Sequence, residues 1–289
     1  MTIKIKRLIK KIFGIKGQTL IANLLVITKQ NNKHILFTTK KARKNKVNLN
    51  YCHDFKNIGD NISPILVEYA AKTHNIDINQ DVKQTKHLFA VGSIITAGAQ
   101  DCTVWGSGLL NTKILGRLYK RKLDIRSVRG PLSRIVLMDQ GYYVPEVYGD
   151  PAILMPLIYD AVIEKTYPIS VITHTNEKVD LPDAKIHIIN VKTSDYKTFV
   201  EEIKASEVVI SSSLHGIIFA ESYGVPAIML RPQVDLFKYY DYYYSTNRYS
   251  FPIAETVAEA LDMRPAELPD FTYMREGLLR AFPKDLWVV

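Results

Sequence analysis

Apolar runs of strand length alternate along the chain with apolar positions at helical spacing. The runs predict strands at 47–52, 88–91, 103–105, 125–128, 169–173, 186–190, 208–211 and 227–230. The helical spacing predicts helices at 62–73, 131–139, 196–205, 214–223, 235–244, 255–261 and 273–281. Strands that alternate with helices are typical of parallel sheets covered by helices. The sequence therefore predicts an α/β protein.

The alternation is interrupted between about residues 150 and 168, which indicates a domain boundary. A chain of 289 residues is long enough for two domains. We expect a basic arm and the start of the first domain over residues 1–46. We then expect one α/β domain over 47–150, and a second over 151–289 that includes the C-terminal helices.

Positive charge is concentrated at the N-terminus. Residues 1–50 hold 13 Lys and Arg and no Asp or Glu, so the net charge of +9 belongs to this segment. Apolar residues at 5, 8, 9, 12 and 13 recur between lysines at helical spacing. A basic amphipathic helix suits an anionic membrane surface or nucleic acid, and a solvated arm is the alternative. Of these partners nucleic acid is the less expected.

The remaining composition favours a cytoplasmic protein, either free or peripheral on the cytoplasmic face of the membrane. The sequence has no run of 18 or more apolar residues, and charges interrupt any stretch that resembles a signal peptide. Cys52 and Cys102 lack the spacing of a metal site and are too few for a disulfide framework. We expect two buried free thiols, no metal site and no cofactor.

Glycines and polar residues follow several predicted strands, where open α/β sheets bind their ligands. These segments are 57–61, 92–93, 105–108, 127–131 and 211–216. Asn61 is expected to cap the helix that follows, and free N–H groups at a helix start can bind an anion. A purely structural turn is the alternative for the first three segments. The spacing is not that of a dinucleotide-binding loop, so NAD is not expected.

Two residues in these segments carry the clearest chemistry. His215 falls in the first turn of a helix, directly after an apolar strand and a serine turn. A helix N-terminus disfavours imidazolium, which leaves a neutral imidazole able to exchange protons. Arg129 stands at a strand tip and can grip a carboxylate or a phosphate through two hydrogen bonds. A surface salt bridge is the alternative for Arg129.

Five short motifs occur in order and carry a resemblance to a known family. They are Gly59-Asp60-Asn61, Trp105-Gly106-Ser107-Gly108, Arg129-Gly130-Pro131, Tyr148-Gly149-Asp150-Pro151-Ala152 and Ser213-Leu214-His215-Gly216. Over about residues 50–235 the chain resembles polysaccharide pyruvyl transferases, most closely the bacterial exopolysaccharide ketal-pyruvate branch. The resemblance implies two Rossmann-like domains that face a cleft in a GT-B-like arrangement. It also implies phosphoenolpyruvate as donor and a saccharide, possibly lipid-linked, as acceptor.

The motifs supply the candidate site residues. His215 is expected to be the general acid and base. Asp60 and Asp150 are candidates for a second base or for acceptor binding, although Asp150 can instead only shape its turn. The candidate substrate-binding residues are Gly59, Asn61, Ser107, Arg129, Ser213 and Leu214. Where related motifs read Arg-Leu-His, this chain has Ser213, so the missing donor-binding charge is expected from Arg129, Arg231, Lys238 or Arg248.

Two other functions remain open at this point. A GT-B glycosyltransferase that uses a nucleotide sugar shares the same architecture and an anion-binding cleft. A non-catalytic protein that binds anions or nucleic acid through the basic arm belongs to a different class. The products formed separate the two enzymes, and binding to nucleic acid at physiological salt tests the third hypothesis.

The basic N-terminus predicts reversible binding to anionic membranes through residues 1–16. Each basic residue near an anionic leaflet contributes roughly 1 kcal/mol, and this segment holds Lys4, Lys6, Arg7, Lys10, Lys11 and Lys16. Deleting residues 1–16 should release the protein from anionic liposomes in a sedimentation assay, while neutral liposomes serve as the control. Equal sedimentation of the full and truncated proteins, or unfolding of the truncated one, would contradict this prediction.

Overall fold

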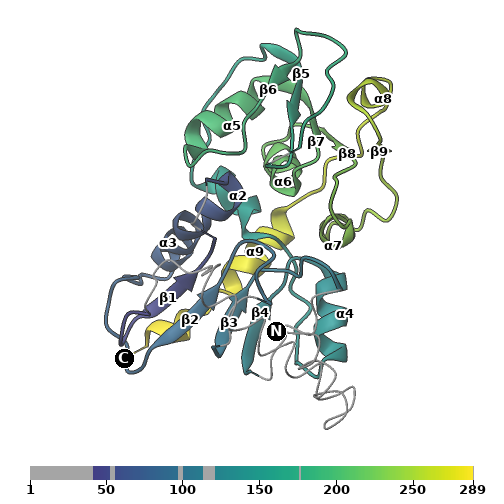
Figure 1. The fold of residues 1–289 in the computed structure, drawn as a ribbon. Coiled ribbons are helices and arrows are strands. Elements are labelled where there is room, and N and C mark those ends of the chain that lie inside the picture. Colours follow the sequence, from purple (N-terminus) through teal and green to yellow (C-terminus); the bar gives the residue numbers. More distant parts are fainter. Residues whose placement is uncertain (1–41, 53–55, 97–99, 113–120, 176, 289) are drawn as a thin grey trace, which may run out of the picture.

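Two parallel sheets form separate lobes (Figure 1). The computed structural model describes residues 42–52, 56–96, 100–112, 121–175 and 177–288. The first sheet has the order β1-β2-β3-β4 and contains β1 (Val47–Asn50), β2 (Lys86–Phe89), β3 (Cys102–Trp105) and β4 (Leu123–Ser127). The second has the order β6-β5-β7-β8-β9 and contains β5 (Tyr167–Ile172), β6 (His187–Ile188), β7 (Ser206–Ser211), β8 (Ala227–Leu230) and β9 (Ile253–Ala254). The α/β prediction is confirmed, and only the two-residue β9 was not predicted.

Helices join and cover these strands, and all of those described except the short one at residues 58–61 lie close to predicted positions. They are α2 (Ile58–Asn61), α3 (Ser63–Thr73), α4 (Pro131–Asp139), α5 (Tyr196–Lys204), α6 (Leu214–Ser222), α7 (Phe237–Ser245), α8 (Val257–Leu261) and α9 (Thr272–Arg280). Two 3-10 helices, η2 (Pro151–Leu157) and η3 (Lys284–Trp287), were not predicted. The expected capping by Asn61 is wrong. The Asn57 side chain caps instead, accepting from the Gly59 N–H at 3.1 Å, because the chain turns helical one turn early as α2.

The order of the second sheet marks a place for a ligand. β6 and β7 lie on opposite sides of β5, so the direction of strand addition reverses at β5. In open α/β sheets such a reversal leaves a crevice outside the carboxyl ends of the two diverging strands. The segments that follow β5 and β7 begin at residues 173 and 212.

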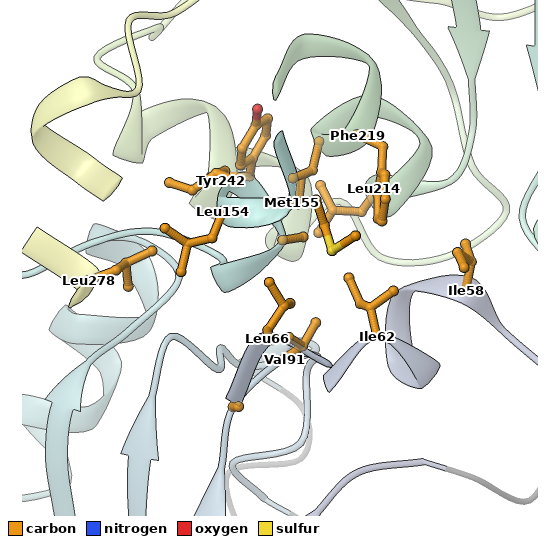
Figure 2. Packing of buried hydrophobic residues seen from close by; sticks show 14 of the residues in the cluster. Ile58, Ile62, Leu66, Val91, Leu154, Met155, Leu214, Phe219, Tyr242 and Leu278 are labelled. Carbon is orange, nitrogen blue, oxygen red and sulfur yellow. The ribbon is translucent and has the colours of Figure 1, made fainter. Parts of the chain in front are cut away.

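The main apolar core is continuous between the two lobes (Figure 2). Ile62 and Leu66 of the first lobe face Leu214 and Phe219 of α6, and η2 lies between them. Residues 151–155 of η2 are buried. Full burial of a side chain as large as Ile153, Leu154 or Met155 contributes about 1.5–3 kcal/mol to stability. The first part of the segment expected to separate the two domains, residues 151–155, is therefore a buried connector that packs against both lobes.

The C-terminal elements return to the first lobe. The Trp105 indole N–H donates to the Leu278 carbonyl of α9 at 2.8 Å, and Phe282 stacks on His74 with ring centroids 5.8 Å apart. Arg126 of β4 bonds to Asp285 of η3 at 2.8 Å. Residues 151–289 thus contribute to both lobes, although the second sheet is built wholly from them.

Three smaller findings bear on the sequence predictions. Cys52 and Cys102 are buried free thiols, as expected. Across the described ranges, no helix is long and apolar enough to cross a membrane. The basic segment at residues 1–16 lies outside the described residues.

A buried ion pair fastens α6 to the turn after α7. Both Arg248 terminal nitrogens lie 2.6 Å from the Glu221 carboxylate, and the Tyr242 hydroxyl donates to the same group at 2.5 Å. The Arg248 and Glu221 side chains are only 11% and 1% exposed. Arg231 and Glu255 also pair at 2.5 Å, but their side chains are 43% and 59% exposed.

The two arginines provide a matched test of burial. Arg248→Met should lower the free energy of unfolding by about 3–5 kcal/mol, because it leaves the Glu221 charge buried without its partner. Arg231→Met should cost less than about 1 kcal/mol, since its pair is exposed. Urea denaturation measures both, and equal losses in the two variants would refute this account of Arg248.

Candidate functional site

A cavity of about 810 Å³ lies where segments from the two lobes meet. Most of its lining residues follow strands at their carboxyl ends, as expected for an open α/β sheet. The first lobe supplies Cys52, Lys56, Asn57, Asp60, Gly92, Ser93, Ile94, Leu110 and Arg129. The second supplies His174, Thr175, Lys192, Ser213, Leu214, His215 and Lys238. A ligand in the cavity would therefore contact both lobes.

His215 lies in the first turn of α6, and its ring occupies space that a side chain at residue 59 would fill. A Cβ placed on Gly59 would lie 1.8 Å from the His215 Nδ1. The other ring nitrogen, Nε2, is buried and has no hydrogen-bond partner among the described residues. It lies 3.6 Å from the Asp150 Oδ2, which is slightly beyond hydrogen-bond distance. Catalytic contacts are often this long before a ligand binds.

Asp150 shapes its turn, as one of the two sequence readings expected, and also lies near His215. Its Oδ1 accepts from the Ala152 N–H at 3.0 Å and so shapes the start of η2. Its Oδ2 faces His215, although Asp150 itself is 1% exposed and does not line the cavity. The arrangement places a buried carboxylate behind the histidine, on the side of the ring away from Gly59.

The serine turn before α6 positions His215. The Ser213 Oγ accepts from the Gly216 N–H at 3.4 Å and caps the helix. The Ser211 hydroxyl donates to the Ile172 carbonyl at 2.9 Å and ties the end of β7 to the end of β5. Ser213 and Leu214 both line the cavity. The serine turn expected at this strand-to-helix junction is therefore present, and Ser213 supplies its hydroxyl cap.

Asp60 and Lys238 place opposite charges on the cavity wall. Burial raises the pKa of Asp60 to about 6, although the positive charges of His215 and Lys238 oppose this rise. Burial, helped by the nearby Arg129, lowers the pKa of Lys238 to about 8. At pH 7 most Asp60 side chains are ionised and most Lys238 side chains are protonated. Both groups can exchange protons within about one pH unit of neutrality.

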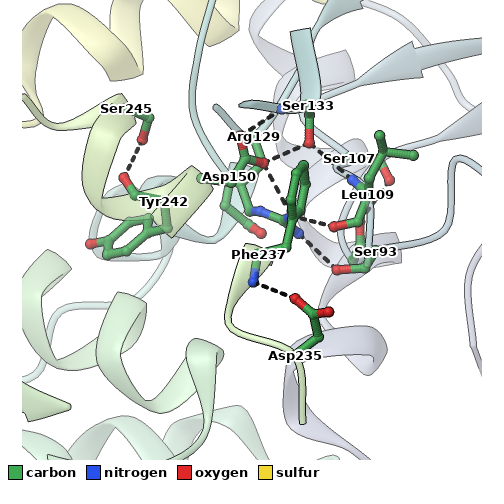
Figure 3. Close-up of polar contacts among 12 residues, drawn as sticks. Ser93, Ser107, Leu109, Arg129, Ser133, Asp150, Asp235, Phe237, Tyr242 and Ser245 are labelled. Carbon is green, nitrogen blue, oxygen red and sulfur yellow. Dashed lines mark hydrogen bonds and ion pairs between the residues drawn. The ribbon is translucent and has the colours of Figure 1, made fainter. Parts of the chain in front are cut away.

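Arg129 reaches the cavity wall, but its guanidinium is bound to protein atoms (Figure 3). One terminal nitrogen donates to the Ser93 Oγ at 2.7 Å, and the other donates to the Leu109 carbonyl at 2.6 Å. The second nitrogen also lies 3.1 Å from the Asp241 carboxylate. The pair is buried, so the surface salt bridge considered from the sequence does not occur. The expected free fork for a ligand is absent as well, because both ends are engaged.

The structure brings together only part of the predicted set. Asp60, Arg129, Ser213, Leu214, His215 and Lys238 line the cavity, and Gly59 packs directly against His215. Asn61 lies outside it. Ser107 is buried and its hydroxyl donates to the Gly92 carbonyl at 2.6 Å, so it supports the wall.

Arg231 and Arg248 do not replace the charge missing at Ser213, because each is held in an ion pair away from the cavity. Arg231 pairs with Glu255 and Arg248 with Glu221, and neither lines the cavity. Lys238 does line it, with 8% of the residue exposed.

Several residues in or beside the cavity were not among the predicted site residues, and three of them contact predicted ones or the serine turn. His174 follows β5, and its N–H donates to the Ser212 Oγ at 2.9 Å. The sequence could have indicated His174, because it directly follows a predicted strand, much as His215 does. Ser93 is Arg129's partner and belongs to the segment 92–93 that the sequence marked after a strand, whereas Asp241 is the counterion of Arg129 and stands in no pattern that indicates a site.

Comparisons with known proteins place these motifs in context. The family model described as polysaccharide pyruvyl transferase matches residues 57–233, which is more than half of the chain. An uncharacterized protein of Acanthamoeba polyphaga mimivirus is 26% identical over 218 residues, covering 70% of this chain and 75% of that protein. The crystal structure of a functionally uncharacterized protein from Klebsiella pneumoniae has a TM-score of 0.47 at 14% identity, covering 80% of this chain and 95% of that one.

The contact between Gly59 and His215 can be tested with two glycine substitutions. Gly59→Ala should lower stability by about 1–3 kcal/mol and shift the His215 imidazole signals in NMR spectra, because the new methyl group displaces the ring. Gly277→Ala is the control, since its Cβ would meet nothing closer than 3.7 Å and alanine favours the helix. Unchanged His215 signals in a folded Gly59→Ala protein would contradict the geometry.

Proposed function

This chain belongs to the polysaccharide pyruvyl transferase family, and from that premise we propose that it moves the pyruvate unit of phosphoenolpyruvate onto two hydroxyls of a saccharide as a ketal. The observation that supports the proposal is a single cavity that gathers His215, Asp60 and Lys238, with Asp150 behind the histidine. These groups supply proton transfer and a positive charge at one place. Ketal formation from an anionic enol ester needs both.

Lys238 is the proposed contact for the donor anion. Phosphoenolpyruvate carries a carboxylate and a phosphate, and Lys238 is a largely buried cation on the cavity wall. A cation in such an environment interacts with an anion more strongly than one in water. Lys56 and Lys192 also line the cavity, but both are exposed. We therefore assign to Lys238 the charge that related motifs carry at the position of Ser213.

The proposed proton transfers balance with two groups. Protonated His215 donates to C3 of phosphoenolpyruvate, which becomes a methyl group while C2 becomes cationic. One saccharide hydroxyl attacks C2 and gives its proton to Asp60. The bond between C2 and the phosphate oxygen then breaks, and the departing phosphate takes the electron pair and the proton held by Asp60. The second hydroxyl closes the ketal ring and returns a proton to His215.

The rest of the cavity is proposed to hold the acceptor. Its volume of about 810 Å³ is in the range of sites for small molecules. His174 and Thr175 line it from the second lobe. We further propose that the two lobes are arranged as in GT-B enzymes. The reaction would take place in the cytoplasm on soluble or lipid-linked glycans. Residues 1–16 would provide contact with the membrane.

Product analysis tests the proposal directly. The purified protein is incubated with phosphoenolpyruvate and a panel of candidate glycans, while glycan mass and free phosphate are followed. The proposal expects a pyruvate ketal and one equivalent of phosphate. A glycoside and free nucleotide, formed when nucleotide sugars replace phosphoenolpyruvate, would instead establish the glycosyltransferase. Neither product with any glycan would favour a binding protein.

Substitution of the proposed acid and base should remove most of the turnover. Loss of a general acid–base group typically costs on the order of 100- to 10,000-fold in rate, so His215→Ala should lower kcat by that range. His187→Ala is the matched control, because His187 lies on β6 outside the cavity and pairs with Glu202. If His215→Ala retains more than half of the wild-type rate, His215 is not the acid and base.

A further inference from the structure

A buried carboxylate of α7 links the two lobes beside the cavity. Asp241 is 0% exposed. Its Oδ1 accepts from the Ser133 N–H at 2.9 Å, and its Oδ2 accepts from the Ser133 hydroxyl at 2.6 Å. The same Oδ2 lies 3.1 Å from the Arg129 guanidinium. Ser133 and Arg129 belong to the first lobe, so a residue of the second lobe satisfies both.

Two glycines make this approach possible. A Cβ on Gly130 would lie 1.9 Å from the Asp241 carbonyl oxygen, and a Cβ on Gly108 would lie 2.5 Å from the Arg129 Cζ. A side chain at either position would force the backbone or the guanidinium to move. The motif glycines beside Arg129 thus serve the contact between Arg129 and α7.

Lys238 lies one helical turn before Asp241 on α7 and, unlike Asp241, lines the cavity, as Arg129 does. The charged or titratable groups that act on it are Arg129, Asp60, Glu177 and His174. Arg129 is a permanent cation, and a like charge nearby disfavours protonation of a lysine. An anion bound directly to Arg129 weakens this repulsion.

We propose that Asp241 is a positioning residue for the cavity: it holds Arg129 in place and offsets its charge, so that Lys238 can carry a positive charge beside it. The wall then carries the buried cations Arg129 and Lys238 and the carboxyl group of Asp60, while Asp241 lies behind Arg129. Of these two buried cations, Lys238 is the one available to a ligand, whereas the charge of Arg129 is offset in part by Asp241. The inference rests on the proposed function only where it treats Lys238 as the donor contact.

The protonation of Lys238 can be measured without any substrate. Trace acetylation of the intact full-length protein over a pH series, followed by peptide mass spectrometry, gives the midpoint at which Lys238 becomes reactive. Asp241→Asn should lower this midpoint by on the order of one pH unit, because the Arg129 charge is no longer offset. Arg129→Gln should raise it, because the repulsion is removed and Asp241 remains. The double variant should return it toward the wild-type value.

Ser133→Ala is the matched control, since it removes a hydrogen bond to Asp241 without changing any charge. Its midpoint should stay at the wild-type value. Circular dichroism verifies that each variant is folded. If one single variant fails to fold, the direction of the shift in the other decides. No shift, a shift in the opposite direction, or an equal shift in Ser133→Ala would overturn the proposal. Inactivity with phosphoenolpyruvate would overturn the proposed function alone, because the acetylation midpoints do not depend on it.

Discussion

The imidazole of His215 fills the space beside Gly59, and the other features of the cavity depend on this contact. Because a Cβ at Gly59 would lie 1.8 Å from the ring, α2 and α6 can meet at their N-terminal turns only if residue 59 has no side chain. The meeting places Asp60, the next residue, on the cavity wall with His215. It also leaves the other edge of the ring toward Asp150. One missing side chain therefore allows residues from three distant segments to form one site.

Charge in the cavity is arranged in layers of different exposure. Arg129 and Asp241 are buried and compensate each other, and further out Asp60 and Lys238 have pKa values displaced toward neutrality. Burial is the main cause of both displacements, because it penalises an ion of either sign. Lys56 and Lys192 at the exposed rim retain contact with water. Such a gradient is suited to an anion that enters from solvent and reacts where proton transfer is possible.

The two lobes share more structure than an alternation of strands and helices suggests. The core runs from α3 through η2 to α6, and α9 returns to the first lobe through the Trp105 indole. Helix α7 follows the second sheet in sequence, but its Asp241 is bound to Arg129 and Ser133 of the first lobe. The cavity wall is consequently made of elements held from both sides. This is a physical reason for the motifs to be spread over most of the family match.

The sequence by itself determined most of the strands and helices and several of the residues that line the cavity. Hydrophobic period is a local property, and a polar residue that follows a buried strand must lie at the carboxyl edge of its sheet. Gly59, Asp60, Arg129 and His215 could be found in this way. The two-residue β9 and the cap at Asn57 could not be found in this way. A segment of one or two residues is too short to show a hydrophobic period.

Only the tertiary structure decided which side chains meet. From the sequence alone, Arg231, Lys238 and Arg248 are equally good candidates for a donor-binding cation. In the structure the two arginines pair with Glu255 and Glu221 away from the cavity, whereas Lys238 lines it. Asp241 lies within a tyrosine-rich helix and becomes the partner of Arg129 only when α7 docks on the first lobe. The physical reason is that an ion pair depends on the distance between two groups. For Arg129 and Asp241 that distance is set by the docking of segments more than 100 residues apart, and no local pattern records it.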